Sequence, residues 1–289
     1  MLEYLYESRS EKWHRFGKAI IHNAIFYYGM NQWAINRKRV VLSVIIGVIV
    51  LIIGIPTYLF FNISPTCSDN KRNGDESGVD CGGSCKLICS NETLPLIMKG
   101  DPRVLKVATS TYEVVVTVEN PNVSGQVFLA PYTINIYGAE SSVPLKVIQA
   151  QTFVPKHSTF GIFQGPFNLG DAVPVRATFV WGEADFVWEK NLNQVPELEI
   201  KDGVLSNLDK TPRLEATLSS AFLSKVSNIE LVALVSDQNG NVIAASKTFI
   251  DVLNPGEVVP VVFSWPNSFV GEGVTFEIIP RILPDKSFI

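Results

Sequence analysis

The sequence holds little of the chemistry that most enzymes need. Histidine occurs three times in 289 residues, and His157 is the only one beyond residue 39. The zinc-protease motif His-Glu-x-x-His, the phosphate-binding loop, the dinucleotide-binding glycine fingerprint and the Gly-x-Ser-x-Gly elbow are all absent. A Ser/His/Asp triad would have to use His157, which lies in the short stretch VPKHST and is expected to be a surface histidine. The sequence therefore predicts a protein that is not an enzyme and has no catalytic residues or organic cofactor.

A strong net charge is also lacking. The formal net charge is −4, which argues against a broadly basic nucleic-acid binder, so no nucleic-acid partner is expected. The charge is unevenly spread, because residues 1–39 hold seven of the 24 Lys and Arg residues but only three of the 28 Asp and Glu residues. A basic head and an acidic body suit a tail beside an anionic membrane surface with a soluble domain beyond it.

No charged residue occurs between residues 40 and 61, which read VVLSVIIGVIVLIIGIPTYLFF. At about 1.5 Å per residue, this segment spans roughly 33 Å as a helix, close to the ~30 Å hydrocarbon core of a bilayer. A buried core helix is rarely apolar on every face over such a length. A cleaved signal peptide would have a shorter apolar run that ends in small residues. We therefore expect one transmembrane helix over residues 40–61.

Flanking charges predict the orientation of this segment. Arg37, Lys38 and Arg39 abut its N-terminal end, whereas only Lys71 and Arg72 are basic within the next dozen positions after it. Basic flanks stay in the cytoplasm. The expected localisation is the cell membrane, crossed once, with a cytoplasmic N-terminus and an extracytoplasmic C-terminal domain.

The tail at residues 1–39 has a helical pattern of its own. Apolar residues recur there at steps of three and four: Trp13, Phe16, Ile20, Ala24 and Tyr27. Further aromatic rings precede the basic triplet, an arrangement that favours the headgroup layer. We expect an amphipathic helix that lies on the inner membrane face and contacts lipid. Docking to a cytoplasmic partner is the alternative.

Beyond residue 101, short alternating runs separated by Gly, Pro, Asn and Asp replace the helical pattern. In YEVVVTVE, Val114 and Val116 fall on one face and Glu113 on the other. Two such sets fill residues 101–190 and 191–289, and YTINIYGAESSVPLKVIQAQTF in the first set runs parallel to ELVALVSDQNGNVIAASKTF in the second. We expect two copies of one unit, each an Ig-like antiparallel β-sandwich.

The second copy reads VSDQNGNVIAASKTFID and then LNPGEVVPVVFSW. This combination of an Asp-x-x-Gly hairpin and Pro-Gly-Glu before the next strand resembles the FxLYD and late-embryogenesis-abundant group of small β-sandwich modules. In the first copy, residues 138–142 and 155–158 replace these two motifs. The chain as a whole looks like anchored surface proteins of bacteria with reduced genomes. The resemblance implies a noncatalytic module and supplies no ligand.

All four cysteines fall in the segment CSDNKRNGDESGVDCGGSCKLIC, at Cys67, Cys81, Cys85 and Cys89. An even number of clustered cysteines outside the membrane predicts two disulfides, in any of three connectivities. A four-cysteine zinc site is the rival, but it usually uses two close Cys pairs, and here the first cysteine stands alone. We expect residues 62–100 to be a stalk braced by this disulfide-rich knot.

The segment from residue 73 to residue 85 resembles a recurrent extracellular motif, Asn-Gly-x-Glu-x-Gly-x-Asp-Cys-Gly-Gly-x-Cys. Five oxygen-bearing side chains lie within twelve residues of this region: Asp69, Asn73, Asp75, Glu76 and Asp80. Calcium takes six to eight oxygen ligands, so these residues are candidate calcium ligands. The spacing differs from an EF-hand, and the alternative is a solvated turn locked by disulfides.

Together these patterns predict a membrane-anchored extracytoplasmic protein that is structural or binds other proteins. The β-sandwiches would be presented for adhesion or for scaffolding of an envelope complex, with a protein partner that the sequence does not identify. The alternative is a membrane component of a secretion or pilus-type apparatus that acts through its N-terminal helix.

Overall fold

The computed structural model describes residues 32–61, 67–139, 142–269 and 274–284. Most of the expected amphipathic tail, residues 1–31, lies outside the described residues. The chain divides into two compact units, residues 1–64 and residues 65–289, and each is described by itself. Its β-rich content and its N-terminal apolar helix were both predicted from the sequence and are confirmed.

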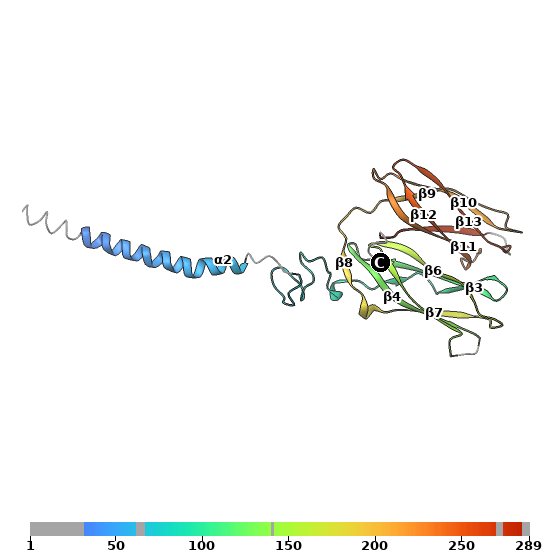
Figure 1. The fold of residues 1–289 in the computed structure, drawn as a ribbon, viewed down its shortest axis with the longest axis horizontal. Helices are drawn as coiled ribbons and strands as arrows, with labels where there is room; N and C mark the ends of the chain where they lie inside the picture. Colours follow the sequence, from blue (N-terminus) through green and yellow to red (C-terminus); the bar gives the residue numbers. More distant parts are fainter. Residues whose placement is uncertain (1–31, 62–66, 140–141, 270–273, 285–289) are drawn as a thin grey trace, which may run out of the picture. The chain divides into compact units, whose positions relative to one another are not determined.

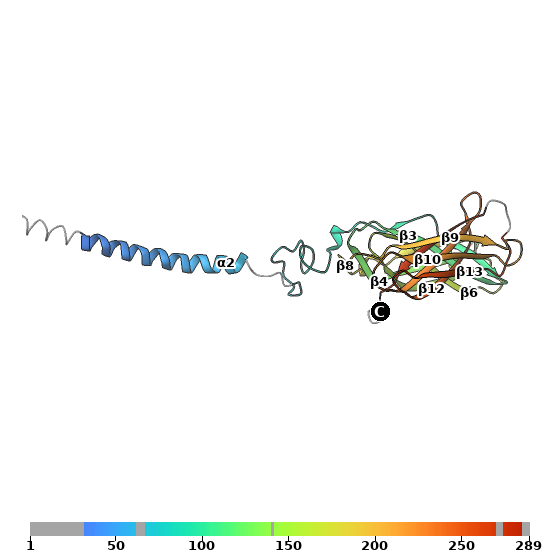
Figure 2. The same ribbon diagram turned by 90° about the horizontal axis from the view of Figure 1, so that it is seen from above.

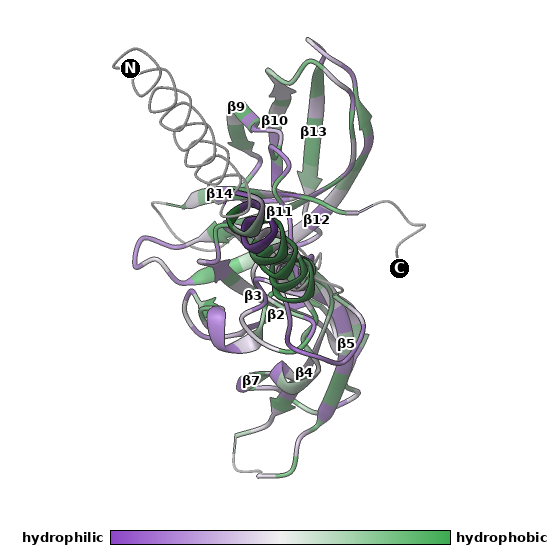
Figure 3. Ribbon diagram, turned by 90° about the vertical axis from the view of Figure 1, so that its left-hand side faces the viewer, coloured by the Kyte–Doolittle hydropathy of each residue, from purple (hydrophilic) through white to green (hydrophobic). Residues whose placement is uncertain are grey.

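In the described part of the first unit, one helix, Gln32–Leu59, is long and apolar enough to cross a membrane (Figures 1 and 3). Near its C-terminal end the helix widens into a π-turn, η1 (Val50–Gly54), which leads into α2 (Ile55–Phe61). Pro56 lies just after this turn and has no N–H to donate, so the regular hydrogen-bond ladder cannot continue through it. The Thr57 hydroxyl donates to Ile53 O at 2.6 Å, which satisfies one of the carbonyls at this irregularity.

The second unit contains fourteen described strands, and they form two successive sets. The first set, here called the first repeat, comprises β1 (Ile97–Met98), β2 (Arg103–Ala108), β3 (Thr111–Asn120), β4 (Gly125–Tyr137), β5 (Lys146–Val154), β6 (Ser158–Asn168), β7 (Arg176–Trp181) and β8 (Trp188–Lys190). The second repeat comprises β9 (Leu198–Ser206), β10 (Arg213–Ser220), β11 (Val226–Ser236), β12 (Val242–Leu253), β13 (Val258–Ser264) and β14 (Thr275–Ile282). Two short 3-10 turns, η2 (Ser90–Glu92) and η3 (Glu183–Asp185), accompany the first repeat.

Both repeats pair their strands in the same order. In the first, β3 pairs with β2 and β6 while β4 pairs with β5 and β7; in the second, β10 pairs with β9 and β13 while β11 pairs with β12 and β14. Every one of these pairs is antiparallel. The shared order agrees with the internal similarity of the two sequence segments. We refer to β1, β2, β3 and β6 as the inner sheet of the first repeat and to β4, β5, β7 and β8 as its outer sheet.

Each repeat encloses a core between its two sheets. In the first repeat, Val116 of β3 and Phe160 of β6 share a buried cluster with Ile134 of β4. In the second repeat, Leu218 of β10 shares a cluster with Leu231 of β11. The alternation of apolar residues along each strand accounts for these cores, because every second side chain points to the same face.

A third buried cluster joins the two repeats. It contains Leu105 and Val115 from the inner sheet of the first repeat, packed with Val232, Leu234, Ala245 and Ile279 from the sheet of β11, β12 and β14. That sheet is here called the inner sheet of the second repeat, and the sheet of β9, β10 and β13 is its outer sheet. The four sheets therefore stack in the order outer, inner, inner, outer, with β6 beside β11 and β14 (Figure 1).

The repeats lie parallel to one another in this stack. Asn267, just after β13, donates to Val107 O near the end of β2, and Arg281 near the end of β14 contacts the end of β5. The end of β2 in the first repeat and the end of β13 in the second lie at corresponding ends of the strands, and so do the ends of β5 and β14. Like ends of the two repeats therefore meet. Figure 2 shows the strands of both repeats running along one general direction. The relation between the repeats is thus close to a translation.

Candidate functional site

The cysteine segment folds into a knot closed by two disulfides, as the sequence predicts. Cys67 is bonded to Cys85 and Cys81 to Cys89, and no cysteine is free. Of the three possible connectivities this is the interleaved one, in which each bridge encloses one cysteine of the other. Two interleaved bridges hold a short segment that has too little apolar area to form a core of its own.

The glycines of the motif stand where the chain passes close to itself. A Cβ atom built on Gly78 would lie 2.8 Å from the sulfurs of both Cys81 and Cys89. Gly82 and Gly83 have positive φ angles of 80° and 50°, and a side chain on Gly83 would overlap the carbonyl group of Asp75. The Gly-x-Asp-Cys-Gly-Gly spacing therefore reflects how tightly the knot is wound.

Asp80 organises the start of the knot. Its two carboxylate oxygens each accept a backbone N–H at 2.9 Å, from Asp69 and from Asn70. Asp69 in turn accepts the Lys71 N–H at 2.9 Å and the Asn73 side-chain amide at 2.8 Å. These two carboxylates act as hydrogen-bond acceptors that fold the loop.

The remaining candidate calcium ligands serve other turns. Asp75 accepts the Ser84 hydroxyl at 2.9 Å, and Glu76 accepts the Asn73 N–H at 3.1 Å. The structure thus brings Asp69, Asn73 and Asp80 close together, while the carboxylates of Asp75 and Glu76 bond to different partners. Calcium binding stays a prediction, and each of its proposed side-chain ligands already has a role in shaping the knot.

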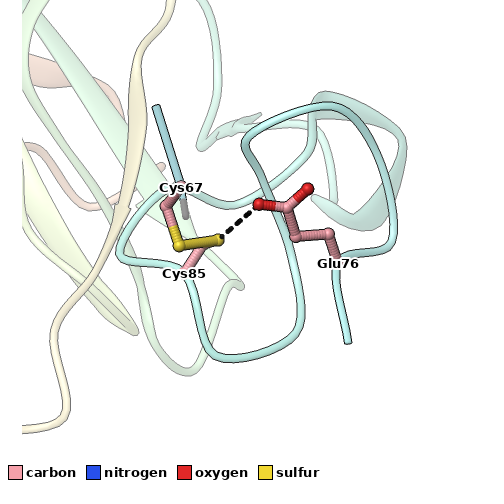
Figure 4. Close-up of side chains that lie close together, drawn as sticks. All are labelled: Cys67, Glu76 and Cys85. Carbon is pink, nitrogen blue, oxygen red and sulfur yellow. Dashed lines mark hydrogen bonds between the residues drawn. A yellow bond between two sulfur atoms is a disulfide. The ribbon is translucent and has the colours of Figure 1, made fainter. Parts of the chain in front are cut away.

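Glu76 is the one buried acid of the knot and lies against a disulfide (Figure 4). Its Oε1 is 3.4 Å from Cys85 Sγ, and Cys67, Glu76 and Cys85 form the one converging group of His, Cys, Asp or Glu ligand atoms among the described residues. Metal binding by cysteine requires thiolates, whereas these two sulfurs are bonded to each other. The geometry is therefore that of a cross-link beside a buried carboxylate.

Main-chain hydrogen bonds dock the knot onto the first repeat. Ile88 N–H donates to Trp188 O at 2.9 Å, and Lys190 N–H donates to Lys86 O at 2.8 Å. The Lys86 ammonium is 2.7 Å from Glu189 Oε2, and the Ile88 side chain packs against the first core. The segment boundary expected at residue 100 stays a prediction, but contacts with the first repeat already begin at Gly83, whose carbonyl group accepts the Lys190 ammonium.

A second polar arrangement, which sequence reasoning missed, joins the two repeats. Arg281 of β14 donates through Nε to Glu230 of β11 at 3.0 Å, and its Nη1 reaches Thr152 Oγ1 at 2.8 Å and Phe153 O at 3.0 Å in β5. Lys247 lies 3.7 Å from the second oxygen of Glu230. A glutamate inside the apolar run NIELVALV was the available signal, because a charge in such a run needs a partner when buried.

Glu113 of β3 is the other acid in this contact. Its side chain is only 7% exposed and accepts the backbone N–H of Ala245 in β12. Burial raises the pKa of the Glu113 carboxyl to about 7, because desolvation disfavours the charged form. The alternation of YEVVVTVE placed Glu113 on the face opposite the core, and in the structure the second repeat covers that face.

Comparison with known proteins gives no family. No family model and no curated protein matches this chain. Among solved structures, the transglutaminase of red sea bream is 11% identical with a TM-score of 0.21. The match covers 71% of this chain and 32% of the transglutaminase chain. A β-glucuronidase of glycoside hydrolase family 2 is 15% identical with a TM-score of 0.19, covering 72% of this chain and 26% of its own. This chain spans about a third or less of those enzymes, and the likeness carries no functional argument.

Proposed function

We propose that this protein is a single-pass membrane protein whose C-terminal part is an extracytoplasmic scaffold that binds other proteins. The observation that carries the proposal is the order along the chain: an apolar helix long enough to cross a membrane is followed by a knot closed by two disulfides. Disulfides persist in oxidising compartments and are rare in the cytoplasm. The basic residues before the helix favour a cytoplasmic N-terminus.

The stacked sheets support a scaffold role. We propose that each repeat is an Ig-like β-sandwich of the FxLYD type, and that the two sandwiches act as one presenting body because a buried cluster and the hydrogen bonds from Arg281 to β5 join them. Chemically, such a body offers stable outer faces and loops for adhesion or envelope assembly. The membrane lipid holds the N-terminal helix, and an unidentified protein is the partner of the ectodomain.

The membrane topology can be tested by labelling engineered cysteines in intact cells with a membrane-impermeant maleimide. Leu223, which is 91% exposed in the turn between β10 and β11, is a suitable site, and Ser10 is its counterpart before the helix. We expect Leu223→Cys to react in intact cells and Ser10→Cys to react only after lysis. The opposite pattern would overturn the proposal. Replacing Arg37, Lys38 and Arg39 with Glu should produce mixed labelling, since basic flanks set the orientation.

Partner binding can be separated from the tail by a pull-down with and without residues 1–39. A partner retained by the shortened chain supports the ectodomain as the binding part. A partner lost with the tail would instead favour an apparatus component that acts through its N-terminal helix.

A further inference from the structure

The contact between the two repeats contains an ionisable group, the Glu113 carboxyl, that has no ion-pair partner among the described residues. Glu113 projects from β3 on the face opposite Val114, and its cross-strand neighbour is Leu105, a member of the cluster that joins the repeats. No ion pair of Glu113 occurs among the described residues, and its carboxyl group accepts the N–H of Ala245. A carboxylate held this way is costly when charged.

The acceptor role explains why Glu113 is placed there. Ala245 belongs to β12, whose one partner among the described strands is β11, so the N–H on its far side would otherwise lack a strand partner. The carbonyl group of the same residue accepts Trp265 Nε1 at 2.7 Å. Glu113 from the first repeat and Trp265 from the second therefore satisfy both backbone groups of Ala245.

Few charged groups lie near Glu113, and none of them forms an ion pair with it among the described residues. From β2, Lys106 lines a hollow of about 70 Å³ beside Glu113, together with Trp265 and Asn267. From β11, β12 and β14, the charged residues of the contact are Glu230, Lys247 and Arg281, which pair with one another. From β6 the nearby polar residue is Gln164, which is neutral and donates to the Tyr132 hydroxyl at 2.6 Å.

We propose that Glu113 makes the contact between the two repeats a proton-dependent latch, closed when its carboxyl group is protonated and loosened when that group ionises. The protonated acid still accepts the Ala245 N–H through its carbonyl oxygen and brings no charge into the apolar contact. The ionised acid must either remain buried without a counter-charge or be hydrated by separation of β3 from β12. This inference goes beyond the proposed scaffold role and does not depend on membrane topology.

The direction of the pH effect follows from the pKa of Glu113. Its pKa is raised from 4.5 to about 7 in the closed contact, mainly by burial, while the Ala245 N–H opposes part of the rise. A group with a raised pKa stabilises the closed contact fully below its open-state pKa, and this stabilisation is lost as the pH rises through the closed-state pKa. The latch is therefore firmest below about pH 4.5, weakens as the pH rises from there to about 7, and changes little above pH 7.

Hydrogen exchange of the full chain in detergent micelles tests the latch. Peptides from β12 and β3 should exchange more readily as the pH rises from 5 to 7, after correction for the intrinsic exchange rate. The opening equilibrium should grow on the order of tenfold per pH unit in this range, because one proton is released on opening, and it should level off above pH 7, where Glu113 is ionised in both states. Glu113→Gln keeps a carbonyl acceptor but cannot ionise, so its protection should be independent of pH between 5 and 9.

The matched control is Glu119→Gln on the same strand, whose side chain is 33% exposed and pairs with Lys99. It should keep the wild-type pH profile. Equal protection of β10 peptides in all variants will show that the second core remains folded. A flat wild-type profile, which needs no variant, would overturn the latch, and so would a wild-type slope retained by Glu113→Gln.

Discussion

Single residues at the contact between the repeats decide how firmly the two halves hold together. Arg281 and Glu230 are both nearly fully buried, and Arg281 spans from its own repeat to the backbone of β5 in the other. Replacing one member of a buried pair leaves the other without compensation, which costs about 3–5 kcal/mol. We expect Arg281→Met to lower the free energy of unfolding in urea by an amount in that range, reduced by the nearby Lys247.

The double variant Arg281→Met with Glu230→Gln should recover part of this loss, because no buried charge is then left unpaired. Arg213→Met serves as the control, since its partner Glu215 is exposed and surface pairs contribute about 0–1 kcal/mol. Equal losses for Arg281→Met and Arg213→Met would contradict a buried role for the pair.

Gly161 marks a close approach between the repeats. A Cβ atom added there would lie 3.0 to 3.1 Å from three atoms of the Val232 side chain. Overpacking of this kind costs about 1–3 kcal/mol. We expect Gly161→Ala and Val232→Ala each to destabilise the chain in thermal unfolding, the first by crowding and the second by a cavity. Combining them should cost less than the sum, since each relieves the other; strict additivity would mean that the two residues do not touch.

At the scale of elements, the knot is the segment whose stability rests on covalent links. The two bridges close loops with sequence separations of 18 and 8 residues. Loop-closure entropy predicts losses of about 3 and 2.5 kcal/mol respectively when each pair is changed to serine. We expect limited proteolysis to cleave residues 67–85 faster after reduction, while the β core keeps its thermal transition.

Mass spectrometry supplies the control for this experiment. The oxidised protein should be lighter than the reduced protein by the mass of four hydrogens and should contain no free thiol. Free thiols in the purified oxidised protein would contradict the paired knot, and unfolding of both repeats on reduction would show that the knot carries more of the fold than its contacts indicate.

The strands show which parts of the structure could be predicted from the sequence. β10 alternates cleanly, because its second face is open to solvent, and its position and inward residues follow from the pattern alone. β3 and β11 carry apolar residues on both faces, as strands covered on both sides do, and alternation could not say what covers the second face. The contact between repeats depends on pairs such as Val115 and Val232 that are distant in sequence.

The disulfide knot could be predicted from the sequence only in part, for similar reasons. Cysteine count and compartment predicted two disulfides, but spacing alone could not choose the interleaved pairing, which depends on the folded path of the loop. The acids of the knot were recognised as oxygen donors. Their actual partners, such as the two backbone N–H groups held by Asp80, follow from turns that no pattern specifies.

At the scale of the whole molecule, the stack of repeats ends in the outer faces of its two outer sheets. These two faces correspond to the two faces of the inner sheets that are covered where the repeats meet. Thr133 and Asn135 flank the core residue Ile134 on the first outer sheet, as Val232 and Leu234 flank the core residue Ala233 on the second inner sheet. Glu215 likewise lies between the core residues Leu214 and Ala216 on the second outer sheet, as Val115 lies between Val114 and Val116 on the first inner sheet. At these three positions, polar residues thus stand where the stack ends.

These polar residues matter because the repeats are related by something close to a translation. A contact of that kind is heterologous, so matching free faces would let molecules add end to end without closing. Terminal repeats of stacked proteins carry polar outer faces for the same reason. We infer that the polar side chains of the two outer sheets keep separate molecules from stacking on one another.

The corresponding prediction is that apolar outer faces will make the protein polymerise. A variant with Thr133→Val, Asn135→Leu and Glu215→Val should form long head-to-tail oligomers in light scattering of the full chain in detergent. Variants with only the first two changes, or only the third, should associate weakly, because each then has one matching face. A mixture of the two partial variants tests the geometry further, because one variant supplies each apolar face. Together they should form mixed pairs that neither variant forms alone. Dimers that stop at two would instead indicate an isologous contact between identical faces, and the translational relation of the repeats would then not govern assembly.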